Sequence, residues 1–114
     1  GRSSMAILAG RLSMALAASA SSINGTFEIL GPLTRKGLAG FELCLMDSPV
    51  ACKKVTEAGE AVLEIEKRSN FVVRAQYRPN YPDSFIVGNA GEASFRYPTY
   101  MGNRLEAEAL GLLR

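Results

Sequence analysis

Two cysteines are the residues of this chain whose type and spacing could do chemistry. Cys44 and Cys52 are the only cysteines among the 114 residues, and the stretch between them contains Asp, Ser and Pro. A zinc site normally needs four ligands, and the chain has no histidine and no further cysteine to supply them. A redox pair usually encloses two residues, fewer than separate these cysteines. The pair is therefore a structural disulfide or two buried thiols.

The residues around the pair favour the disulfide. Residues 40–47 show strand-like alternation, and residues 51–59 have the pattern of a short strand that runs into a turn. Pro49 belongs in the loop between them because it cannot donate a ladder hydrogen bond. Such a hairpin brings Cys44 and Cys52 to facing positions. Closing so short a loop should stabilise the fold by roughly 2–3 kcal/mol. We expect a disulfide, and with it an exported protein in the periplasm, at the cell surface or outside the cell.

Alternation with a period of two runs through most of the chain. In residues 25–31, for example, Phe27 and Ile29 alternate with Glu28 and Leu30. Short strands at this spacing, separated by Gly, Pro and Asn without intervening helical patterns, predict a mainly β, antiparallel sandwich of immunoglobulin-like or transthyretin-like type. The predicted strands cover residues 25–31, 40–47, 51–59, 60–67, 70–77, 83–88 and 92–98.

The N-terminal segment, residues 1–22, differs in composition from the rest and is rich in Ala and Ser. It has two interpretations. One is a secretory signal that begins at Met5 and offers the small residues 18–20 for cleavage. The other is an amphipathic helix, since Met5 and the three leucines that follow it are spaced at three and four. In either case the apolar run is too short and too interrupted to span a bilayer.

The C-terminal segment, residues 101–114, has a helical pattern. Asn103 and Glu106 have the spacing of a capping box, and Leu105, Ala109 and Leu112 fall on one face of the predicted helix. The chain therefore divides into three parts. These are an N-terminal helical or signal-like segment (1–22), a β-sandwich domain (23–100) and a C-terminal helix (101–114).

Several turn-and-strand stretches share the pattern of a known family. They are the opening strand, a Gly-Leu-Ala-Gly segment that leads into the second strand, a turn that ends in Ala-Gly before an alternating strand, and the loop YRPNYP; in order they span residues 25–30, 37–43, 54–63 and 77–82. Over about residues 24–88 the chain resembles a carboxypeptidase regulatory-like domain, the transthyretin-like β-sandwich of many exported bacterial proteins. The resemblance implies a non-catalytic structural or binding module that contacts a protein or a carbohydrate and needs no cofactor.

The loop at 77–83 is the strongest candidate for a contact surface. Tyrosine and arginine are favoured at binding hot spots, and two prolines restrict this loop at a predicted end of the sandwich, where binding loops usually lie. We therefore expect Tyr77, Arg78, Tyr81 and Asp83 to contact the partner. The opposing interpretation places Tyr77, Phe85 and Phe95 in the core, because aromatic residues dominate sandwich cores.

Charge and composition narrow the classes of function. Thirteen basic and eleven acidic residues give a net charge of +2, which is too balanced to indicate nucleic acid as a partner. The lack of histidine removes the commonest general base and the commonest metal ligand, so we expect neither an enzyme nor a metal site. For the binding module we also expect a homo-oligomer in which residues 5–20 pack between chains. The alternative function is a subunit of a larger assembly, a filament, pilus or virion, held together through the N-terminal helix.

Overall fold

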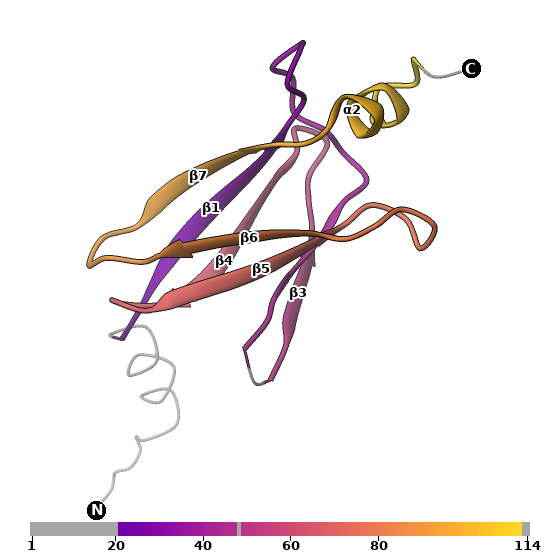
Figure 1. The fold of residues 1–114 in the computed structure, drawn as a ribbon. Helices are drawn as coiled ribbons and strands as arrows, with labels where there is room; N and C mark the ends of the chain where they lie inside the picture. Colours follow the sequence, from indigo (N-terminus) through magenta and orange to yellow (C-terminus); the bar gives the residue numbers. More distant parts are fainter. Residues whose placement is uncertain (1–20, 48, 113–114) are drawn as a thin grey trace, which may run out of the picture.

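The computed structural model describes residues 21–47 and 49–112, which form two β-sheets and one short helix (Figure 1). The prediction of a mainly β fold is confirmed. The predicted N-terminal helix or signal falls almost wholly on residues 1–20, outside the described residues. The elements are β1 (Ser22–Leu30), β2 (Glu42–Leu45), β3 (Ala51–Lys54), β4 (Glu60–Glu66), β5 (Asn70–Gln76), β6 (Ser84–Asn89), β7 (Phe95–Tyr100) and α2 (Asn103–Ala109).

The seven strands divide into a three-stranded and a four-stranded sheet. The three-stranded sheet has the order β4-β1-β7, and the four-stranded sheet has the order β3-β2-β5-β6. Every pair is antiparallel except β1 and β7, which run parallel. The prediction of a wholly antiparallel fold is therefore wrong at this pair. After β6 the chain crosses from the four-stranded sheet to the other one, and it places its last strand beside its first in the same direction.

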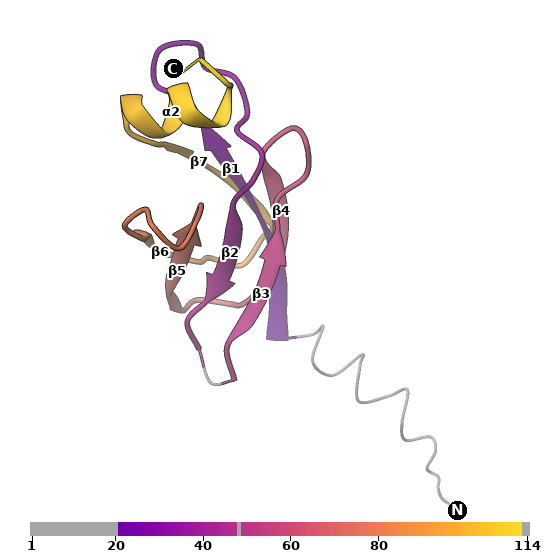
Figure 2. The same cartoon turned by 90° about the vertical axis from the view of Figure 1, so that its right-hand side faces the viewer.

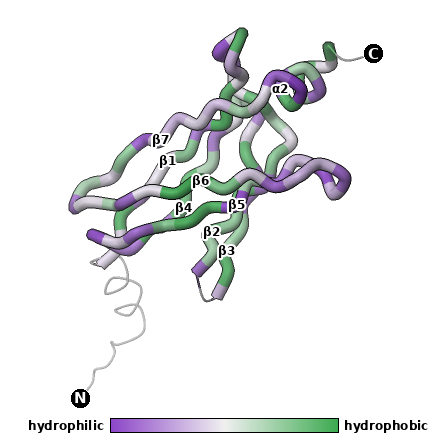
Figure 3. Tube along the Cα trace, in the orientation of Figure 1, coloured by the Kyte–Doolittle hydropathy of each residue, from purple (hydrophilic) through white to green (hydrophobic). Residues whose placement is uncertain are grey.

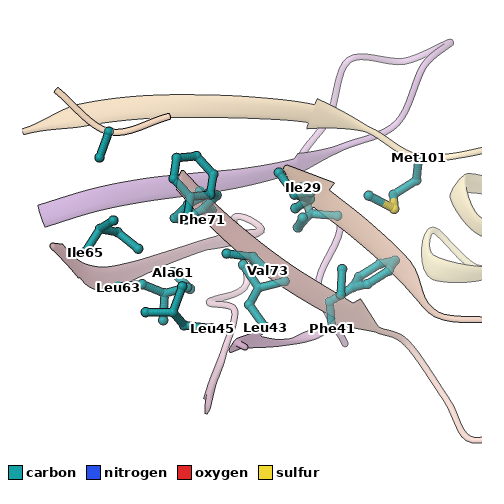
Figure 4. Close-up of a cluster of buried hydrophobic side chains, with 14 of the residues drawn as sticks. Ile29, Phe41, Leu43, Leu45, Ala61, Leu63, Ile65, Phe71, Val73 and Met101 are labelled. Atoms are coloured by element: carbon teal, nitrogen blue, oxygen red, sulfur yellow. The ribbon is translucent and has the colours of Figure 1, made fainter. Parts of the chain in front are cut away.

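The inner faces of the two sheets enclose one hydrophobic core (Figure 4). Phe27 on β1 is fully buried, and its ring meets that of Phe71 on β5 edge to face at 5.5 Å between centroids. The rings of Phe95 and Tyr97 from β7 each lie 5.9 Å from Phe27. The period-two alternation predicted for the strands that became β1, β4 and β5 is confirmed, because their inward positions are buried and their outward positions more exposed.

The placement of Phe85 in the core is wrong. Its side chain is 58% exposed, whereas its neighbour Ile86 is buried. Successive strand residues point to opposite faces, so only one of the two can turn inward. The register pairs Phe85 with Arg74 and Ile86 with Val73, which puts Phe85 on the outer face of the four-stranded sheet. Phe85 and Val87 are thus exposed on one face of β6 and Ile86 is buried on the other, and hydrophobic residues follow one another along this strand (Figure 3).

Helix α2 begins without the predicted capping box. Its N-cap is Gly102, no side chain caps it, and Glu106 is instead buried with 3% of its surface exposed. The predicted apolar face is also incomplete, because Leu112 lies beyond the end of the helix and is 64% exposed. The Glu106 carboxylate turns away from its own helix to the loop that follows β1. The spacing of the residues therefore predicted the helix correctly but did not predict the hydrogen-bond partners of Glu106.

Glu106 joins α2 to that loop through three hydrogen bonds. Its carboxylate accepts the Thr34 hydroxyl at 2.6 Å, the Thr34 backbone N–H at 2.7 Å and the Leu33 backbone N–H at 3.2 Å. Gly31 leaves room for it, since a Cβ on this glycine would lie 2.3 Å from Glu106 Oε2. The Thr34 hydroxyl, with the two N–H groups, lowers the pKa of Glu106 below its ordinary value of 4.5, against the opposing effect of burial.

The Glu106 contact predicts a pH-dependent contribution to stability. The pKa of this carboxyl is lower in the folded than in the unfolded chain, so the stabilisation is present above pH 4.5 and is lost as the pH falls through the folded-state value. We expect Glu106→Gln to lower the melting temperature by several degrees at neutral pH. The difference in melting temperature between this variant and the unaltered chain should become smaller at acidic pH. Thermal unfolding followed by circular dichroism measures this difference. A difference in melting temperature that does not change with pH would contradict the role of the Glu106 charge.

Candidate functional site

The loop between β5 and β6 carries the predicted contact residues and lies on the side of the molecule that holds α2 (Figure 1). The Tyr77 ring packs on Phe41 with 4.9 Å between centroids, and the Tyr81 ring meets Tyr77 edge to face at 5.5 Å. The Arg78 guanidinium lies over the Tyr77 ring, with Cζ 4.9 Å from its centroid. The loop is therefore an ordered aromatic cluster, with Tyr77 partly buried at its centre.

Helix α2 holds this cluster through a single carboxylate. Glu108 Oε1 accepts the Tyr81 hydroxyl at 3.0 Å, and Glu108 Oε2 lies 3.2 Å from Arg78 Nη1. The fourth predicted residue, Asp83, lies apart from these contacts. Its Oδ2 is 3.9 Å from Arg74 Nε, on the strand β5 that precedes the loop. The structure thus brings Tyr77, Arg78 and Tyr81 together and gives Asp83 a different partner.

A cavity of about 330 Å³ opens beside the loop at the ends of β2, β3 and β5. Gly40 makes this space possible, since its φ of +93° favours glycine and a Cβ there would lie 2.9 Å from the Tyr77 ring. Tyr77 and Arg78 of the loop both line the cavity. Its lining consists of Gly40, Phe41, Glu42, Lys54, Val55, Gln76, Tyr77, Arg78 and Pro79.

Polar side chains form a row across the strands that line the cavity. Glu42 on β2 stands opposite Lys54 on β3 and opposite Gln76 on β5. Among the described residues no ion pair joins Glu42 to Lys54. The cavity therefore offers a carboxylate, an ammonium and an amide that can each turn to a ligand. This row is the part of the site that sequence reasoning missed, because alternation assigns these residues to the surface without showing that they meet.

The disulfide lies in the next row of the same outer face. Cys44 pairs with Cys52 across β2 and β3, and the structure joins them by a disulfide bond, as predicted. Glu42 and Lys54 are each two residues from a cysteine, so the bond fixes β3, which carries one side of the cavity, against β2. The β2–β3 hairpin projects at the end of the molecule opposite α2 (Figure 2).

Within residues 21–47 and 49–112, no group of Cys, Asp and Glu is arranged to hold a metal ion. In the same part of the chain no helix has the length and apolar character needed to cross a membrane. The site thus consists of the aromatic loop cluster, the polar row and the disulfide beside them. No protein-family model and no curated protein matches the sequence.

Proposed function

We propose that this chain is a non-enzymatic binding module of an exported bacterial protein, which contacts a protein or carbohydrate partner at the cavity beside the loop 77–83. The observation that carries the proposal is the combination of Tyr77 with the polar row of Glu42, Lys54 and Gln76 around one cavity. Its volume of about 330 Å³ falls at the lower end of the range for ligand sites.

The chemistry of the lining suits a polar group with a flat apolar face. An aromatic ring provides the apolar contact, while carboxylate, amide and cationic groups exchange hydrogen bonds with hydroxyl groups. A sugar unit of a glycan has both features. A polar side chain of a protein partner offers a subset of them, so we favour carbohydrate as the first class to test.

The transthyretin-like type is the fold assignment that we propose. The seven-stranded, two-sheet arrangement supports the resemblance to carboxypeptidase regulatory-like domains. The strand order argues against the immunoglobulin constant type, in which the first strand pairs with the second; here β1 lies between β4 and β7. The cysteine pair supports export, because disulfides persist in oxidising compartments.

Replacement of Tyr77 by alanine should weaken binding at the cavity strongly. The change removes the aromatic face and the support for Arg78, and truncating such a central aromatic residue typically weakens binding by about 2 kcal/mol or more, roughly 30-fold in affinity. The ¹⁵N-labelled chain is titrated with a panel of oligosaccharides and short peptides, and binding is monitored through changes in its amide chemical shifts.

Tyr100→Ala is the matched control, since Tyr100 is a half-exposed tyrosine that also lies beside an arginine, but on the three-stranded sheet. It should bind as the unaltered chain does. Shift changes centred on Gly40, Gln76 and Arg78 would support the site. An affinity of Tyr77→Ala equal to that of the unaltered chain, or shift changes confined to other surfaces, would contradict it.

A second function, as a subunit of a larger assembly, is favoured by the edge of β6. Among the described residues no further strand pairs with this edge, and its Val87 carbonyl accepts the Tyr97 hydroxyl at 3.0 Å. Three of the four sheet edges carry charge or proline, which discourage pairing with another strand: Glu64 on β4, Lys53 and Lys54 on β3, and Pro98 on β7. Strand β6 has neither, and its outer residues Phe85 and Val87 are 58% and 62% exposed. Such an edge can pair with the same strand of a second copy without opposing like charges.

Val87→Lys should therefore prevent self-association if this edge mediates it. Val62→Lys, at an outward position of β4 that is 40% exposed, is the control and should leave association unchanged. Sedimentation velocity over a range of concentrations measures both. An unaltered chain that stays monomeric at millimolar concentration would rule out assembly through β6 alone.

A further inference from the structure

We propose that the disulfide is a thiol-exchange site at which an incoming thiolate attacks Cys52 and releases Cys44. The two cysteines differ sharply in access. Cys44 on the inner strand β2 is 1% exposed, whereas Cys52 on the edge strand β3 is exposed. Because exchange requires contact between the attacking thiolate and a disulfide sulfur, access selects Cys52. This inference goes beyond the proposed binding function and does not depend on it.

The direction of attack leads to the same sulfur. A thiolate attacks in line with the bond it breaks, from behind the sulfur that it approaches. Behind Cys44 lies β5, whose Arg74 stands opposite Cys44 in the register. Beyond Cys52 the described residues add no further strand to the four-stranded sheet, because β3 is its edge. The line of approach is therefore blocked by Arg74 at Cys44 and open at Cys52.

Arg74 also stabilises the sulfur that departs. Its Nη2 lies 3.6 Å from Cys44 Sγ, within the range of a hydrogen bond to sulfur. Its Nε is buried and has no hydrogen-bond partner within residues 21–47 and 49–112. This atom lies 3.9 Å from the carboxylate of Asp83, so that carboxylate offsets the guanidinium charge only in part. A neighbouring cation favours a thiolate over a thiol, and a more stable thiolate leaves faster.

The exchange step is balanced without any further oxidant or reductant. The incoming thiolate forms a bond to Cys52 Sγ, the Cys44–Cys52 bond breaks, and its electron pair remains on Cys44 as a thiolate beside Arg74. The product is a mixed disulfide between Cys52 and the incoming thiol. The chemical class of the reactant is a low-molecular-weight thiol or the exposed cysteine of another protein. After the step the backbone pairing of β3 with β2 remains, without the covalent link.

The experiment uses the full chain and reduced glutathione in excess at mildly alkaline pH. Samples are quenched with acid, alkylated with N-ethylmaleimide and cleaved with trypsin after Lys36 and Lys53, which releases both cysteines in one peptide. Fragment-ion masses then locate each group. We expect glutathione on Cys52 and N-ethylmaleimide on Cys44. Glutathione found mainly on Cys44 of the unaltered protein, or equally on both cysteines, would overturn the proposal.

Variants separate the charge of Arg74 from its packing. Arg74→Met should slow the exchange by about fivefold to tenfold, and Arg74→Lys should restore most of the rate, because the leaving thiolate keeps a cationic neighbour. Arg96→Met removes an exposed arginine from the other sheet and should leave the rate unchanged. A folded Arg74→Met or Arg74→Gln chain that exchanges as fast as the unaltered one would refute the role of Arg74.

Discussion

Phe27→Ala should lower the free energy of unfolding by about 3–5 kcal/mol, the largest loss that we expect from a single substitution. The Phe27 side chain is fully buried, and its ring contacts aromatic residues from both sheets, including Phe71 and Phe95. Its removal leaves a cavity where the two layers meet, and the rings around it cannot close in without losing contacts of their own. Urea unfolding followed by circular dichroism measures the loss.

Phe85→Ala is the matched control, because it deletes the same atoms from a position that is 58% exposed. We expect it to change the stability by no more than about 0.5 kcal/mol. If Phe27→Ala does not fold, Phe27→Leu should still fold and show a smaller loss. Equal losses at the two phenylalanines would contradict the assignment of one to the core and the other to the outer face.

Removal of the disulfide is the second large effect. The double substitution Cys44→Ser and Cys52→Ser should lower the free energy of unfolding by about 2–3 kcal/mol, because the closed loop no longer restricts the unfolded chain. The effect should concentrate in the β2–β3 hairpin, since β2 is the one strand of the described residues that pairs with β3. Urea unfolding of the oxidised chain and of the double variant measures the difference.

The control is the unaltered chain in excess reductant, which should approach the stability of the double variant, while the oxidised double variant should not respond to reductant. Amide hydrogen exchange adds a local readout. Protection should fall at β3 and persist at β1 and β5, which lie inside their sheets. A double variant as stable as the oxidised protein would show that the disulfide does not stabilise the fold.

Much of the fold follows from alternation along single strands. The predicted strands match β1 to β7 in number and order, and the hairpin that joins Cys44 to Cys52 has the predicted pairing. Alternation is a local signal, fixed by the two faces of each strand. Which strands become neighbours depends instead on how the layers close over the core, and the parallel pairing of β1 with β7 therefore has no sequence signature.

The candidate site could be predicted only in part, for the same reason. Tyrosines, arginine and prolines identified the loop 77–83 by their types alone. The rest of the site comes from distant parts of the chain: Glu108 on α2 binds the loop, and Glu42 on β2 and Lys54 on β3 line the cavity beside it. Their proximity depends on sheet order and register. Glu106 likewise has the local spacing of a helix cap. Its hydrogen-bond partners lie 72 and 73 residues away, so the local pattern does not identify them.

The disulfide links the proposed site to the proposed environment. It lies one row from the polar lining of the cavity and ties the edge strand that carries Lys54 to the rest of the sheet. The Cys44–Cys52 disulfide thus stabilises the shape of the site. The same bond supports the proposal that the protein is exported. Both proposals require that the native protein contains this disulfide.

The direct test is the intact mass of freshly isolated chain after alkylation under denaturing conditions, with and without prior reduction. We expect two alkyl groups to add only after reduction, because Cys44 and Cys52 are the only cysteines and are bonded to each other. Two alkyl groups added without reductant would contradict the account. The assignment to an oxidising compartment would then fall, and assembly inside the cell would become the better hypothesis.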